Sequence, residues 1–115
     1  MSSLKVSVLS ENGVHLFVCE GRIDIAGSAE LDAPVVRLLG EGATRVVIDL
    51  AGVDYISSAG LRSLLVIFKK AMVARARVAL ASPGAAVMEI LELSGFKTLM
   101  NVRPDRESAI RATAE

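Results

Sequence analysis

The chain has 115 residues, of which 52% are hydrophobic and 3% aromatic, and its 13 basic and 13 acidic residues give a formal net charge of zero. This balance argues against nucleic-acid binding, because phosphate backbones select basic surfaces and exposed bases stack on aromatic rings. A single cysteine excludes an internal disulfide, and no apolar run approaches the roughly 18 residues that a membrane-spanning helix needs. We therefore expect one cytoplasmic domain over residues 1–115, without direct membrane insertion.

The N-terminal residues predict a β-hairpin. Apolar and polar residues alternate over 4–9, turn residues follow at 11–13, and a second apolar run spans 14–19. Two short runs joined by a turn that contains glycine are typical of paired antiparallel strands. Residues 21–24 break the pattern, so the second strand is expected to end before them.

A helix is expected over residues 28–39, with Gly40 as its end, because apolar residues recur on one helical face there. Pro34 leaves two alternatives open. Proline is tolerated in the first turn of a helix but not in its interior, so either the regular helix begins near Asp32 or it is kinked at the proline.

The centre of the chain predicts a buried strand followed by the strongest helix. Residues 45–50 are mostly apolar and rich in β-branched side chains, as in a strand covered on both faces. Residues 51–57 are expected to be a loop and residues 58–74 a helix. The apolar stripe predicted to face the core consists of Leu61, Leu64, Leu65, Phe68 and Met72.

A second buried strand is predicted at 78–81. Ser82 and Pro83 then have the pattern of an N-cap followed by a proline in the first helical position. The helix that they begin is expected to reach about Ser94, with Gly95 ending it.

A last short strand is expected at 99–102, followed by a helix over 106–114 that Asp105 caps. The predicted order is therefore β-β-α-β-α-β-α-β-α. This order indicates an α/β fold: a mixed sheet of about five strands with about four helices packed on it.

The usual equipment of enzymes is absent from the sequence. It contains no glycine-rich phosphate loop. His15 and Cys19 are each the sole residue of their type, so a His/Cys metal cluster is excluded, and both fit ordinary structural positions in a strand. We expect no enzymatic activity, no cofactor and no metal.

Two adjacent serines, Ser57 and Ser58, stand where the strongest helix begins. Helix physics alone favours a simple cap, because a serine hydroxyl accepts one of the unpaired N–H groups of the first turn. The same N–H groups and the helix dipole also stabilise an anion such as a phosphoserine. Gly60 is expected to keep this place open to a docking partner because it has no side chain.

The run Ile-Ser-Ser-Ala-Gly-Leu at 56–61 resembles the signature of the STAS domain, and more narrowly that of bacterial anti-sigma factor antagonists. The resemblance extends over nearly the whole chain. Its other segments are 49–50, 53–65, 21–24, 93–96 and 107–110.

The resemblance implies a partner-switching regulator. An unphosphorylated antagonist of this family captures an anti-sigma factor that is also a serine kinase of the histidine-kinase-like ATPase fold. Phosphorylation then releases it, and a phosphatase of the PP2C type resets it. The family's phosphoacceptor falls on Ser58. Ser57, which stands where many members have Asp, is the second choice.

The resemblance also indicates partner-binding residues: Asp24, Ser57, Ser58, Gly60 and Arg62. Asp24 is expected either to contribute to the docking surface or only to satisfy its own turn. The ordinary interpretation of Arg62 is a solvated side chain on the helix surface.

The second functional hypothesis is a STAS subunit that docks on the ATPase of a membrane transport or lipid-trafficking system without phosphorylation. The oligomeric state is expected to be a monomer or a weak dimer.

Overall fold

The structure, a computed structural model, describes residues 3–114. In this range five strands form one sheet in the order β1-β2-β3-β4-β5. β1 and β2 are antiparallel, and all the other neighbours are parallel. The elements are β1 (Leu4–Glu11), β2 (Val14–Ile23), α1 (Ile25–Gly40), β3 (Arg45–Ile56), α2 (Ser58–Ala74), β4 (Arg77–Ala81), α3 (Ala85–Leu93), α4 (Phe96–Leu99), β5 (Asn101–Arg103) and α5 (Arg106–Ala112). The predicted mixed α/β sheet is confirmed, and α4 is a helix that the sequence did not predict.

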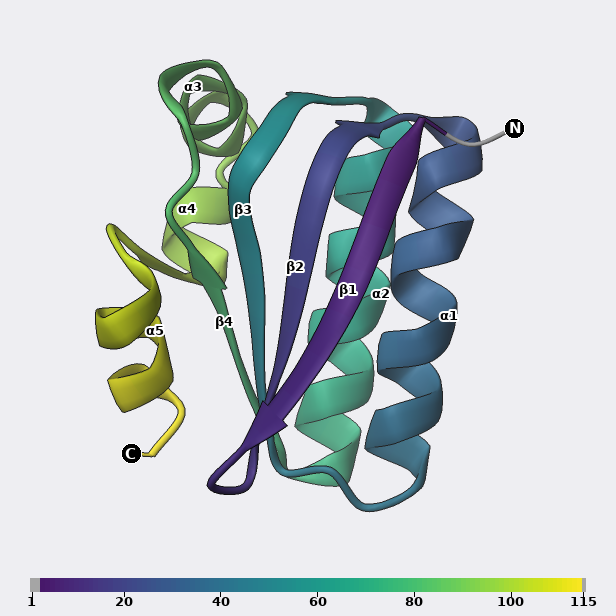
Figure 1. The fold of residues 1–115 in the computed structure, drawn as a ribbon. Coiled ribbons are helices and arrows are strands. Elements are labelled where there is room, and N and C mark those ends of the chain that lie inside the picture. Colours follow the sequence, from purple (N-terminus) through teal and green to yellow (C-terminus); the bar gives the residue numbers. More distant parts are fainter. Residues whose placement is uncertain (1–2, 115) are drawn as a thin grey trace.

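Helices cover the two faces of the sheet unequally (Figure 1). α1 and α2 lie side by side over one face, and the main core fills the space between them and the sheet. α5 packs on the other face over a smaller cluster that includes Val47 and Ala79. Because side chains of a strand alternate between faces, the buried run 46–50 of β3, which is apolar except for Asp49, is covered on both sides.

Two strands are longer than the sequence indicated. β2 continues through Ile23 and β3 through Ile56, so the expected break at 21–24 and the expected loop at 51–57 are wrong. Parallel pairing holds these ends together, with Gly21 opposite Val53 and Ile23 opposite Ile56. The sequence signal failed because backbone pairing between distant segments overrides the weak strand propensity of Gly and Asp.

α1 begins at Ile25 with Asp24 as its N-cap, three residues before the predicted start. The alternative in which the regular helix begins near Asp32 is therefore wrong. Pro34 lies inside the helix, which continues on both sides of it to the predicted end at Gly40.

α2 has the predicted bounds, but its buried face is rotated from the predicted stripe. Met72 is 77% exposed, and Leu61, Leu65 and Phe68 are only partly buried. Small side chains take part in the interface, and a hydrophobic pattern gives them little weight. The buried residues of the helix are Gly60, Ser63, Leu64, Ile67 and Ala71.

The C-terminal elements differ in detail from the prediction. Gly84, rather than Ser82, is the N-cap of α3, and the Ser82 N–H bonds the Arg103 carbonyl instead. β5 begins at Asn101, two residues later than expected, because α4 occupies the residues before it.

The predicted cap of α5 is confirmed, because the Asp105 carboxylate accepts the Ser108 N–H at 2.7 Å. The helix ends at Ala112, before the predicted residue 114. Among residues 3–114, none of the helices has both the length and the apolar character needed to cross a bilayer.

Candidate functional site

Two neighbouring helices begin at the same edge of the sheet (Figure 1). β2 ends at Ile23 and α1 begins at Ile25, while β3 ends at Ile56 and α2 begins at Ser58. Because β2 and β3 are parallel, both helices present their unpaired N–H groups and the positive ends of their dipoles at this edge. We call the first residues of the two helices and their caps, together with Arg62, the helix-start surface: Asp24, Ile25, Ser57, Ser58 and Arg62.

The Ser57 hydroxyl is held by two hydrogen bonds, one accepted and one donated. Its Oγ accepts the Gly60 N–H at 3.1 Å and donates to the Ile23 carbonyl at 3.0 Å. The Ser57 N–H bonds the same carbonyl at 2.9 Å. The side chain is half-buried, so Ser57 is the structural cap of α2 and ties this helix to the end of β2.

Ser58 occupies the first position of α2 and is exposed. Its hydroxyl makes no hydrogen bond with any residue of the range 3–114. The capping role that helix physics offered to either serine is thus taken by Ser57. Ser58 is the serine whose oxygen is accessible to another protein.

Asp24 caps α1. Its carboxylate accepts the Gly27 N–H at 2.9 Å and the Ser3 hydroxyl at 2.9 Å. The Gly27 hydrogen bond, followed by that of Ser3, lowers the pKa of the carboxyl group below its usual value, and the charge of Arg22 acts in the same direction. Asp24 does satisfy its own turn, and its ionised carboxylate lies at the edge where the two helices begin.

Gly60 does not line the surface. It is buried, and a Cβ at this position would stand 2.7 Å from the Ile23 carbonyl oxygen and 2.7 Å from a side-chain carbon of Ile56. The expectation that Gly60 leaves room for a docking partner is therefore wrong. The room is taken by the protein's own sheet, because only glycine lets the first turn of α2 come this close to β2.

Arg62 is exposed one turn after Ser58. Residues four apart share a helix face, and long side chains on a helix lean toward its N-terminus. Arg62 and Ser58 are therefore on the same face of α2. The Arg62 guanidinium makes no ion pair within the described part of the chain.

Three parts of this edge were not predicted from the sequence. The Ile23 carbonyl is a backbone group without a sequence signal. Ile25 is 79% exposed, an unusual state for isoleucine that no periodicity indicated. The Arg22 guanidinium lies 4.2 Å from the centre of the Tyr55 ring, a contact that depends on the unforeseen extension of β2 and β3.

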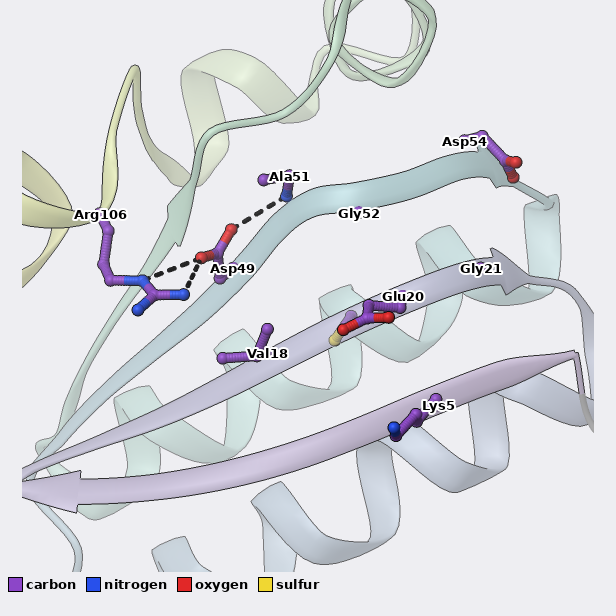
Figure 2. Close-up of a pocket in the computed structure, with 10 residues that line it drawn as sticks. Lys5, Val18, Glu20, Gly21, Asp49, Ala51, Gly52, Asp54 and Arg106 are labelled. Atoms are coloured by element: carbon purple, nitrogen blue, oxygen red, sulfur yellow. Dashed lines mark hydrogen bonds and ion pairs between the residues drawn. The ribbon is translucent and has the colours of Figure 1, made fainter.

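A groove of about 740 Å³ lies on the sheet face opposite α1 and α2, and it contains none of the predicted site residues (Figure 2). At its side Asp49 accepts hydrogen bonds from Arg106 Nε at 3.0 Å and Nη2 at 2.8 Å, while the Ala51 N–H bonds its other oxygen at 2.9 Å. Asp49 is 4% exposed. This ion pair links α5 to β3.

Cys19 lies below the same groove. Burial, followed by the charge of Asp49, raises the pKa of its thiol to about 12. The thiolate is the reactive form of cysteine, so Cys19 is inert at neutral pH. Among residues 3–114 there is no group of His, Cys, Asp and Glu that could hold a metal ion.

Replacing Ser57 with alanine is expected to lower the free energy of unfolding by about 1–2 kcal/mol, because it removes the cap of α2 and the bond to Ile23. Ser58→Ala is the matched control and is expected to stay within about 0.5 kcal/mol of the parent, since this hydroxyl bonds nothing in the fold. Urea titration followed by circular dichroism measures both. Equal effects of the two substitutions would contradict the assignment of the cap.

Comparison with known proteins agrees with this fold. The STAS domain family matches residues 5–109, and the chain belongs to this family. The Bordetella bronchiseptica protein named "Putative anti-sigma factor antagonist BtrV" is 32% identical over 109 residues, which are 95% of this chain and 94% of that protein. The resemblance to antagonists of anti-sigma factors is thus confirmed.

Solved structures show the same fold. An anti-sigma factor antagonist from Mycobacterium paratuberculosis has a TM-score of 0.85 at 23% identity, covering 98% of this chain and 96% of that one. SpoIIAA in its unphosphorylated form has a TM-score of 0.80 at 16% identity, covering 96% and 98%. The phosphorylated form of SpoIIAA from Bacillus has a TM-score of 0.72 at 16% identity, covering 93% and 97%.

Proposed function

We propose that this protein is an anti-sigma factor antagonist that works by partner switching in the cytoplasm. In its unphosphorylated form it binds an anti-sigma factor that is also a serine kinase, and phosphorylation of Ser58 releases it. The observation that carries the proposal is the state of Ser58, an exposed serine with an unbonded hydroxyl in the first position of α2. The proposed role is binding rather than catalysis.

The position of Ser58 suits a phosphate. A phosphoserine carries a charge of about −1.5 to −2, and a helix N-terminus stabilises negative charge through its free N–H groups and its dipole. No acidic residue lies in the first turn of α2 to oppose that charge. The modification therefore changes the surface while the fold beneath it stays in place.

The neighbours of Ser58 suit a protein partner. Ile25 offers exposed apolar area, Asp24 a negative charge and Arg62 a positive charge on the same helix-start surface. Interfaces combine apolar contact with complementary charges, and a new phosphate among them weakens binding through desolvation and repulsion of acidic groups. The partner we propose is a kinase of the histidine-kinase-like ATPase fold, and a PP2C-type phosphatase restores the binding form.

The experiment first isolates the kinase by pull-down, with the wild-type protein as bait, from a lysate of the organism that encodes this protein. With this kinase and ATP, wild-type protein and Ser57→Ala are expected to gain one phosphate on Ser58 by mass spectrometry, while Ser58→Ala gains none. Calorimetry is expected to find Ser58→Asp bound at least about tenfold more weakly than Ser58→Ala.

Two results would overturn the proposal. Phosphate found on Ser57 in the Ser58→Ala variant would move the acceptor to the neighbouring serine. Equal affinity of Ser58→Ala and Ser58→Asp for the recovered protein, with no phosphate transferred to the wild type, would favour a STAS subunit that docks on an ATPase without being modified.

A further inference from the structure

The outer edge of β1 is open. β1 pairs only with β2, and no other strand of residues 3–114 lies beside its outer edge, which faces the viewer in Figure 1. The strand is eight residues long, and residues 7–11 are all exposed. Over residues 5–11 such an edge offers a row of unpaired N–H and C=O groups to another strand.

Apolar side chains accompany this open backbone. Val8 is 47% exposed although it points to the same face as Leu4 and Val6, the face on which α1 packs. Leu9, on the opposite face, is 53% exposed. α1 therefore leaves the middle of β1 uncovered, and both faces of the strand offer apolar area near its centre.

We propose that β1 pairs with β1 of a second copy of this chain, antiparallel about a two-fold axis beside Val8. A two-fold axis perpendicular to the sheet keeps the α1 and α2 layer of both copies on one side. Opposing residues then lie equally far from the axis and point to the same face, as strand alternation requires. The two sheets become one continuous sheet.

Charge complementarity selects this register. With Val8 on the axis, Lys5 lies opposite Glu11 of the second copy, and the symmetry makes this pair twice. Neither residue has an ion pair within the range 3–114. A register centred on Ser7 would set Lys5 against Leu9, and one centred on Leu9 would set Glu11 against Ser7.

The same charges have an ordinary alternative role. Single charged residues on an edge strand discourage pairing with other strands. Here the two charges are opposite in sign and equidistant from Val8, so self-pairing joins them instead of setting like charges opposite each other. Opposite charges on facing strands stabilise the pair, and like charges in these positions destabilise it.

The proposed dimer is independent of the phosphorylation of Ser58. The helix-start surface consists of the N-caps of α1 and α2 and of residues within these helices, and none of its residues is part of β1. The dimer would therefore present two copies of this surface.

Sedimentation equilibrium tests the charge pairs. Lys5→Glu and Glu11→Lys are each expected to raise the dimer dissociation constant about tenfold or more, because each sets like charges opposite each other at two places. The double variant restores the pairs in reversed order and is expected to return close to the wild-type constant. Lys70→Glu, an equal charge change on the exposed side of α2, is the control and leaves the constant unchanged.

Cross-linking tests the axis. Val8→Cys would place two thiols on directly opposing residues, whose Cα atoms lie about 4.5–5.5 Å apart, within the range of a disulfide. With oxidised glutathione this variant is expected to form a covalent dimer. Ser7→Cys, displaced from the axis and expected to cross-link poorly, is the control, and the wild type, whose Cys19 is fully buried, stays unlinked.

Weak association has a dissociation constant in the micromolar range. A wild-type chain that remains monomeric at a protein concentration of about 100 μM would therefore overturn the proposal. So would a dimer whose dissociation constant is the same in wild type and Lys5→Glu, because it would use another face. Preferential cross-linking of Ser7→Cys over Val8→Cys would overturn the register. Circular dichroism establishes that each variant is folded.

Discussion

Replacing Gly60 with valine is expected to lower the free energy of unfolding by about 4 kcal/mol or more. Even the first added carbon would stand 2.7 Å from the Ile23 carbonyl oxygen and 2.8 Å from a methyl group of the same residue. The backbone atom cannot turn away as a flexible side chain would, so the first turn of α2 must move from the sheet. That movement also breaks the bonds from Ser57 to Ile23.

The alanine variant makes this expectation quantitative. Overfilling a packed site costs about 1–3 kcal/mol, and loss of the bonds of the Ser57 cap adds about 1 kcal/mol. The better helix propensity of alanine returns up to about 1 kcal/mol. Gly60→Ala is therefore expected to lose about 2 kcal/mol in urea titration, and the valine variant at least twice as much.

Gly40 supplies the matched control. It is also a helical glycine, at the end of α1, but nothing lies within 4 Å of its Cβ position. Gly40→Ala is expected to be neutral or slightly stabilising. If Gly60→Ala were as stable as Gly40→Ala, close packing of α2 on Ile23 would not be what requires glycine at position 60.

The second large effect is expected at the ion pair between Asp49 and Arg106. Arg106→Met would remove two of the three hydrogen bonds to a buried carboxylate and leave its charge without a counterion. Breaking a fully buried pair in this way costs about 3–5 kcal/mol. Because the Arg106 side chain is 46% exposed beside an open groove, we expect a smaller loss of about 1–3 kcal/mol.

A double-mutant cycle separates the charge from the packing. Asp49→Asn keeps the size of the side chain, and its oxygen can still accept the Ala51 N–H. In the Asp49→Asn background, Arg106→Met is expected to cost much less than in the wild type, with a coupling energy of about 0.5–3 kcal/mol. Strictly additive losses in urea titration would mean that the pair does not stabilise the attachment of α5.

The parts of the fold that the sequence predicted correctly are those with local signals. α2 begins and ends as predicted because a capping serine precedes a long helical pattern, and Asp105 marks the start of α5 in the same way. The second halves of β2 and β3 were missed because their structure comes from pairing across the sheet. With no helix over one face there, residues such as Gly52 and Asp54 lack the hydrophobic pattern of a buried strand.

The candidate site, too, was predictable from the sequence only where its signals are local. Its position on the chain followed from the run at 56–61 and from the family resemblance. The distinction between Ser57 and Ser58 required the structure, because it depends on the Ile23 carbonyl, 34 residues before Ser57 in sequence. The inward position of Gly60 depends on the same close approach, and so does the exposure of Ser58. The partner-binding roles of Asp24 and Arg62 stay predictions.

The two hydrogen bonds from Ser57 to the Ile23 carbonyl have a consequence for the speed of the proposed switch. The backbone just before Ser58 is fixed by both its amide and its side chain, so this part of the proposed docking surface needs no rearrangement before a partner binds. Two rigid patches associate at about 10⁵–10⁷ M⁻¹ s⁻¹ without waiting for a conformational step. In the mechanism proposed above, the response time is therefore set by the rates of the kinase and the phosphatase.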